Sequence, residues 1–182
     1  TGIDYFPLSV EYEERFYAAG AILGSRFQRR EGRPSDEAVL SRRIVDRTIR
    51  PLFEHHIRRE VQVVITVLAI DHDDPDVLAV IAASLALGTS NIPWGGPVSA
   101  LRIGTMKGGD ALIINPTYAE RDATDAAMDL LACGKDGLVN MIEVAANEVS
   151  EGDLERALTR AVEEHEKLQA WQKKIIAERG VE

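Results

Sequence analysis

The chain has a single cysteine, Cys133, among its 182 residues, and aromatic residues make up only 5% of it. One cysteine excludes an intrachain disulfide and any zinc site built from several cysteines, and it favours a reducing, cytoplasmic setting. The shortage of aromatics predicts an aliphatic core. No apolar run approaches the roughly 20 residues that span a bilayer, and the first residues do not form a secretory signal, so we expect no contact with a membrane.

The formal net charge of −9 argues against a polyanionic partner, but the charge is unevenly distributed. One short stretch concentrates arginines, namely Arg26, Arg29, Arg30, Arg33, Arg42, Arg43, Arg47 and Arg50. Arginine pairs with phosphate in a planar, bidentate manner, and the ring of Phe27 offers a face on which a base can stack. Nucleic acid is therefore the first partner to consider.

Hydrophobic periodicity and turn residues divide the chain into alternating elements. We expect strands at 5–17, 61–70, 98–106, 111–114, 128–133 and 138–146, and helices at 35–50, 76–90 and 150–178. This order predicts one domain over residues 1–182, of the α/β or α+β class, in which helices cover a mixed sheet.

Several local features refine this prediction. Ser35 and Ser150 stand where N-caps are expected, each followed by acidic residues in the first helical turn. The run 61–70 is nearly all β-branched, which is typical of a strand buried on both faces. The last helix is expected to bury one apolar stripe, made of Leu154, Leu158, Val162, Leu168 and Ile175.

The arginine-rich stretch permits two interpretations. Arg43, Arg47 and Arg50 recur at helical spacing and share one face, while Arg29, Arg30 and Arg33 lie on the preceding loop, so that together they could clamp successive phosphates. Alternatively, the arginines form a solvated face with ion pairs to Glu31, Asp36, Glu37 and Asp46. Asp46 is the expected partner of a neighbouring arginine in either case.

Four segments, REGRPS at 30–35, IVDRTIRPLF at 44–53, EVQVVITVL at 60–68 and the run from Asp74 to Val98, resemble the polynucleotide phosphorylase family. The resemblance is to the first of that family's two RNase PH-like domains and covers nearly the whole chain. It implies an RNase PH-like fold of the α+β class and a fragment that lacks the N-terminal strands, with residues 150–182 leading toward a helical linker.

The same resemblance implies a function. The family forms ring-shaped homotrimers that degrade mRNA from the 3′ end with inorganic phosphate, release nucleoside diphosphates and use Mg²⁺. In the family, a Phe-Phe-Arg-Arg motif in the pore grips single-stranded RNA; here the stretch reads Phe27-Gln28-Arg29-Arg30 after an extra Arg26. The resemblance thus implies that Phe27, Arg29 and Arg30 contact RNA, with further positive charge from Arg33, Arg43, Arg47 and Arg50. One missing ring would cost about 1–3 kcal/mol of stacking.

The resemblance also implies that this half has no catalytic or metal-binding residues. The family's phosphate-binding serines correspond to Ala82-Ala83-Ser84, a catalytic lysine to Leu131, and one catalytic aspartate falls near Ala123. The other aspartate persists as Asp129, for which we expect a hydrogen bond to a turn amide rather than a metal. We therefore expect this chain to be catalytically silent and Mg²⁺ to serve the full-length enzyme only.

Two other functions remain open from the sequence. The domain could be mainly a ring-forming structural unit whose arginines make salt bridges between proteins, or an independently active RNase PH-like nucleotidyltransferase. Isolated histidines do not favour a metal site, because no HExxH-like spacing exists. We expect His55 and His56 at the surface, His72 in a solvated turn, and Cys133 and His165 in the packed interior.

Overall fold

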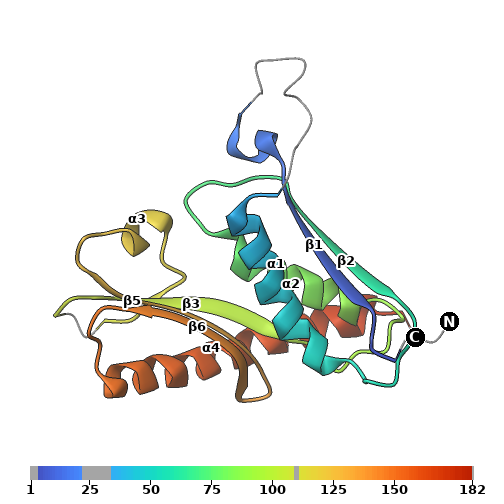
Figure 1. Ribbon diagram of the computed structural model, residues 1–182. Helices are drawn as coiled ribbons and strands as arrows, with labels where there is room; N and C mark the ends of the chain where they lie inside the picture. Colours follow the sequence, from blue (N-terminus) through green and yellow to red (C-terminus); the bar gives the residue numbers. More distant parts are fainter. Residues whose placement is uncertain (1–3, 22–33, 109–110, 182) are drawn as a thin grey trace.

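The computed structural model describes residues 4–21, 34–108 and 111–181. The larger of two sheets has four strands. In Figure 1 the long helix α4 (Glu151–Arg179) covers one side of it, and helices α1 (Asp36–Ile49) and α2 (Pro75–Gly88) lie on the other. A pair of parallel strands packs on the far side of α1 and α2, so these two helices lie between the two sheets. The predicted α+β class is confirmed, and the strands divide between two sheets rather than sharing a single mixed one.

The two inner helices begin where their sequences place capping side chains. Helix α1, Asp36–Ile49, starts at Ser35, whose hydroxyl accepts a hydrogen bond from the amide of Ala38 at 3.0 Å. Helix α2, Pro75–Gly88, starts at Asp74, whose carboxylate accepts from the amide of Asp76 at 3.2 Å. The predicted N-cap at Ser35 is thus confirmed, and each cap satisfies an amide that the helix leaves unpaired.

The parallel pair consists of β1, Leu8–Glu14, and β2, Val61–Val67. Strand β1 ends before the predicted boundary, and a short 3₁₀ helix, η1, follows at Phe16–Ala19. The expectation that 61–70 is buried on both faces is wrong, because Val64 is 53% exposed while its neighbour Val63 is buried. Helices cover only one face of this sheet, so the side chains of β2 alternate between core and solvent.

The larger sheet is antiparallel, in the order β4-β3-β5-β6. Its strands are β3, Ser99–Met106; β4, Ile113–Ile114; β5, Ala126–Lys135; and β6, Leu138–Ala146. A second 3₁₀ helix, η2, lies at Arg50–Leu52, and a one-turn helix, α3, lies at Tyr118–Arg121 between β4 and β5. The sequence analysis missed α3, which begins with a reciprocal Thr117–Glu120 capping box.

Side chains of β3 and β5 alternate between two hydrophobic cores. Ala100, Leu131 and Cys133 join the core under α1 and α2. Leu101, Ile103 and Leu130, with Ala132, join the core under α4. Cys133 is fully buried, as predicted, and burial raises the pKa of its thiol to about 12, which leaves it an unreactive packing group.

Helix α4, Glu151–Arg179, begins at Ser150 as predicted but buries a different stripe from the one expected. The five apolar residues of the expected stripe are only partly buried, and the buried positions are small or polar: Ala157, Ala161, His165, Gln169 and Gln172. The side-chain amide of Gln172 donates a hydrogen bond through Nε2 to the carbonyl of Val98 at 2.9 Å, and its Oε1 accepts one from the hydroxyl of Ser84 at 2.7 Å. Polar contacts therefore fix the register of α4 against the start of β3.

Candidate functional site

The described arginines of α1 differ in their surroundings. Arg43 and Arg47 are exposed and form no ion pair with the described part of the chain. Arg50 instead donates to both carboxylate oxygens of Asp46, at 2.5 and 3.0 Å, and to the carbonyl of Leu8 at 3.0 Å. The predicted pairing of Asp46 is confirmed. Arg50 links the end of α1 to β1 through these contacts, whereas the charged groups of Arg43 and Arg47 are exposed to solvent.

The other residues predicted to contact RNA, Phe27, Arg29, Arg30 and Arg33, lie outside the described residues. The residues on either side of this segment are described. Ala21 and Pro34 both line a hollow of about 430 Å³ at the end of β1, together with Phe16 and Ser35. The described residues that flank this segment, Ala21 and Pro34, therefore lie at one place, near the start of α1.

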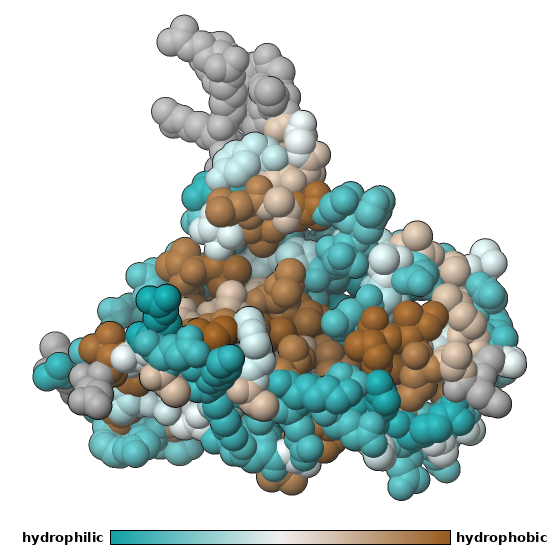
Figure 2. Space-filling view, turned by 180° about the vertical axis from the view of Figure 1, so that it is seen from behind, coloured by the Kyte–Doolittle hydropathy of each residue, from teal (hydrophilic) through white to brown (hydrophobic). Residues whose placement is uncertain are grey.

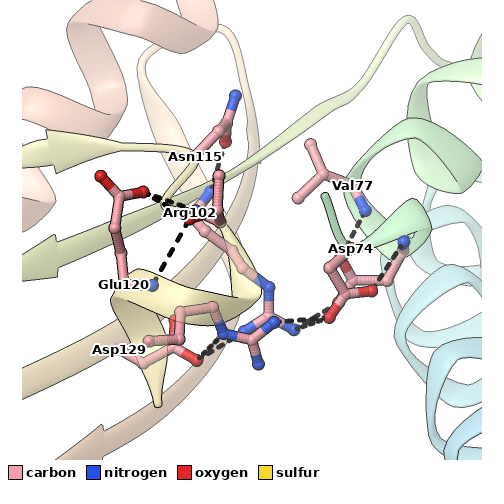
Figure 3. Close-up of polar contacts among 9 residues, drawn as sticks. Asp74, Val77, Arg102, Asn115, Glu120 and Asp129 are labelled. Atoms are coloured by element: carbon pink, nitrogen blue, oxygen red, sulfur yellow. Dashed lines mark hydrogen bonds and ion pairs between the residues drawn. The ribbon is translucent and has the colours of Figure 1, made fainter. Parts of the chain in front are cut away.

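A buried cluster of charges lies where α2, β3, α3 and β5 converge (Figure 3). This central ion-pair cluster consists of Arg102, Arg121, Asp74, Asp76 and Asp129. Arg102 contacts Asp76 at 2.5 Å and Asp129 at 2.8 Å. Arg121 contacts Asp74 at 2.7 Å and Asp129 at 2.9 Å. Two guanidinium groups thus bridge three carboxylates, two at the start of α2 and one in β5.

Strand register explains how the cluster forms. Arg102 lies opposite Leu131 in the β3–β5 pairing, so Asp129, two residues away, is its diagonal neighbour on the same face. The expected hydrogen bond from Asp129 to a turn amide is wrong, because its carboxylate accepts from Arg102 and Arg121 instead. One donor comes from the neighbouring strand β3 and the other from α3, so neither belongs to the strand that carries Asp129.

Burial controls the titration of this cluster. Burial raises the pKa of Asp76, and the nearby guanidinium of Arg102 opposes that rise. Burial also acts to lower the pKa of Arg102, but Asp76, Asp129 and Asp74 outweigh it, and the net pKa is raised. Arg102 therefore stays charged, as a partly buried cation whose removal would leave carboxylates without a counter-charge.

A hollow of about 360 Å³ adjoins the cluster on the side of α1 and β6. Six carboxylate side chains and two arginines line it: Glu14, Glu37, Asp74, Asp76, Asp129, Glu143, Arg102 and Arg121. Since both guanidinium groups already face carboxylates, the hollow repels phosphate rather than attracting it. Carboxylates neutralised by arginine do not fit Mg²⁺ either, and within the described residues no group of His, Cys, Asp and Glu has metal-binding geometry.

Ala82, Ala83 and Ser84, which the resemblance matches to phosphate-binding serines, lie within α2. Ser84 is fully buried; its hydroxyl donates to Gln172 and accepts from the amide of Val98 at 3.0 Å. Leu131, at the corresponding lysine position, is also fully buried. The chemistry of these side chains is that of core packing, and phosphate cannot reach Ser84.

Four members of the central ion-pair cluster, Arg102, Arg121, Asp74 and Asp76, were not predicted from the sequence. One signal was available, because Arg102 is the only charged residue in the strand SALRIGTM, whose side chains are mostly buried. A lone arginine in such a strand requires a counter-charge. The histidines lie as expected: His55, His56 and His72 are exposed, and His165 is buried. Among the residues described, no helix is both long and apolar enough to cross a membrane.

Comparisons with known proteins identify relatives along the whole chain. The model of the 3′ exoribonuclease family, domain 1, matches residues 1–93, and the model of domain 2 of that family matches residues 96–164. A polyribonucleotide nucleotidyltransferase of Thermomicrobium roseum is 48% identical over 98% of this chain and 22% of its own length. That of Alkaliphilus oremlandii is 46% identical over all of this chain and 25% of its own length.

The chain thus spans about a quarter of the length of these curated relatives. Among solved structures, rice Rrp46 superposes with a TM-score of 0.72 over 95% of this chain and 74% of that one. Its sequence is 11% identical, so this likeness concerns the fold alone.

Proposed function

Because the chain belongs to the 3′ exoribonuclease family of RNase PH-like proteins, we propose that it is the RNA-binding first core domain of a phosphorolytic 3′-to-5′ exoribonuclease. The observation that carries this proposal is the 48% identity to a polyribonucleotide nucleotidyltransferase over 98% of the chain. The full-length enzyme would be a nucleotidyltransferase that shortens mRNA and transfers nucleotides to inorganic phosphate, releasing nucleoside diphosphates.

In this proposal, Phe27, Arg29 and Arg30 grip single-stranded RNA, and Arg33, Arg43 and Arg47 add positive charge behind them. The exposure of Arg43 and Arg47, without ion pairs to the described residues, supports their part. Arg50 acts mainly through Asp46 and Leu8, by holding α1 in place. Phosphate contacts of this kind depend on salt, because each releases counterions from the RNA.

We also propose that this half is catalytically silent. The buried Ser84 and the carboxylate-lined hollow support this, since neither offers a place for phosphate. Phosphorolysis and the Mg²⁺ that supports it would then belong to another part of a full-length homotrimer in the cytoplasm.

The experiment is binding of a short single-stranded RNA to the 182-residue chain across a salt series, with phosphorolysis assayed in parallel. An Arg29→Ala/Arg30→Ala variant should bind more weakly, and the slope of log K against log salt should flatten by about 1.4, because two phosphate contacts to a single strand are lost. The chain alone should release no nucleoside diphosphate.

The matched control is Arg156→Ala/Arg160→Ala, which removes the same charge from α4. It should leave both affinity and slope close to those of the parent. Equal binding by parent and loop variant would favour the alternative of a ring-forming structural domain, in which arginines serve ion pairs as Arg50 does. Release of nucleoside diphosphate would favour an independently active nucleotidyltransferase.

A further inference from the structure

Two adjacent aromatic side chains are exposed on the short helix η1. Phe16 is 45% exposed and Tyr17 is 58% exposed, in a protein with an aromatic content of only 5%. In Figure 1, η1 is the short blue helix at the top, projecting away from both sheets. Figure 2, seen from behind, shows hydrophobic surface at the base of this projection. Two consecutive exposed aromatic residues are unusual for a surface with no partner.

The turn that carries these rings is firmly held. The amide of Gly20 donates to the carbonyl of Tyr17 at 3.0 Å, and the amide of Ala21 donates to that of Phe16 at 3.2 Å. Ala18, which follows Tyr17, is buried, and its carbonyl accepts a hydrogen bond from the amide of Ile70 at 2.9 Å. Gly20 ends the turn with φ of +71°, which glycine adopts without strain. Both rings are therefore presented on fixed backbone, so binding to them would cost little ordering entropy.

The turn that carries these rings precedes the arginine-rich segment in the sequence. Phe16 lines the same hollow as Ala21 and Pro34, the described residues nearest the two ends of that segment. Between them the sequence has four arginines, Arg26, Arg29, Arg30 and Arg33, and one acidic residue, Glu31. Cations that follow a phosphate backbone, next to aromatic faces that accept bases, are the combination by which proteins hold single strands.

We propose that Phe16 and Tyr17 form a stacking platform for the bases of single-stranded RNA. The proposal rests on the RNA-binding function proposed above and adds contacts to it. A folded duplex offers few free base faces, so the platform selects unpaired strands. A stacked base makes no charge contact, and the platform therefore contributes affinity that does not depend on salt.

The test uses a short oligouridylate and the 182-residue chain. Tyr17→Ala should weaken binding by about five- to 150-fold, the equivalent of one lost stack, while the salt slope stays that of the parent. Tyr17→Phe keeps the ring and should bind like the parent, whereas Tyr17→Leu keeps apolar area without an aromatic face and should bind like Tyr17→Ala. Trp171 is 50% exposed on α4, which lies at the opposite side of the molecule in Figure 1. Trp171→Ala should therefore leave both the affinity and the salt slope unchanged.

An abasic ribose-phosphate oligomer gives a second readout. It should bind the parent and Tyr17→Ala equally, because it has no bases to stack. Circular dichroism of each variant establishes that it is folded, and Phe16→Ala should repeat the result at the neighbouring ring.

The outcomes separate the two proposals. If the parent binds and Arg29→Ala/Arg30→Ala binds weakly but Tyr17→Ala binds normally, the platform is wrong and the RNA-binding function stands. A flattened salt slope in Tyr17→Ala would also overturn the platform, since the loss would be electrostatic. If the folded parent does not bind oligouridylate at all, both proposals fail, and the exposed rings belong to a protein interface.

Discussion

Arg102 neutralises Asp76, the one carboxylate of the central ion-pair cluster that Arg121 does not contact. Asp76 has a side chain that is only 2% exposed, and Arg102 contacts it at 2.5 Å. We expect Arg102→Met to lower the free energy of unfolding by about 3–5 kcal/mol, because it leaves a buried carboxylate without its counter-charge. Urea unfolding at pH 7 measures this loss. Arg43→Met, at an exposed helix position, should stay within about 0.5 kcal/mol of the parent, and equal losses in the two variants would contradict the assigned role of Arg102.

Individual side-chain partners were predictable only where they are local. Asp46 and Arg50 are one helical turn apart, so helix geometry alone pairs them. Arg102 finds Asp76 and Asp129 at separations of 26 and 27 residues, through the β3–β5 register and the position of the α2 N-terminus. Neither the strand register nor the position of the α2 N-terminus can be predicted from the residues that neighbour these side chains in the sequence.

At the scale of elements, helix α4 illustrates what periodicity can and cannot identify. Its length and its cap at Ser150 followed from the sequence, but its buried face did not. Leucines predict a core stripe, yet Ala157 and Ala161 are buried because small side chains let the helix approach the sheet closely. The polar Gln169 is buried because Ser99 and Gly134 accept its hydrogen bonds. A buried glutamine becomes predictable only once its acceptors are known.

His165 makes the docking of α4 sensitive to acid. The side chain is 1% exposed, its Nδ1 lies 2.9 Å from the Ser99 hydroxyl, and burial lowers its pKa to about 4. The pKa in the unfolded chain is about 6.5, so only the unfolded chain takes up the proton between these values. Stability should be complete above about pH 6.5 and fall as the pH decreases toward 4, with a loss of about 2 kcal/mol from this group between pH 7 and pH 5.

Urea unfolding of the parent and of His165→Asn at both pH values isolates this contribution. The variant should be less stable than the parent at pH 7 and should lose less stability on acidification. His72→Asn serves as the control, because His72 is exposed and its replacement should leave the pH dependence of the parent unchanged. An identical acid loss in parent and His165→Asn would show that other groups are responsible.

At the scale of the whole molecule, the two family models meet between residues 93 and 96, which suggests a division of the chain in the middle. The packing does not follow that division. Strands β3 and β5 both lie in the second part, yet Ala100 and Leu131 complete the core of the first part under α1 and α2. The link from Ser84 in α2 to Gln172 in α4 also joins the two parts. The prediction of one domain over 1–182 therefore has a physical basis in a sheet shared by two cores.

Cooperative unfolding tests that prediction with the two tryptophans as probes. Trp94 packs against the core under α1 and α2, and Trp171 lies on α4, so each reports on a different part. In Trp171→Phe and Trp94→Phe, the fluorescence of the remaining tryptophan should give the same urea midpoint as far-UV circular dichroism of that same variant, because neither core can lose β3 and β5 while the other stays folded. Comparing probes within one variant removes any stability change caused by the substitution itself. A midpoint for Trp171 below that of the circular dichroism transition would mean that α4 and its core unfold first, and the chain would then consist of two units rather than one.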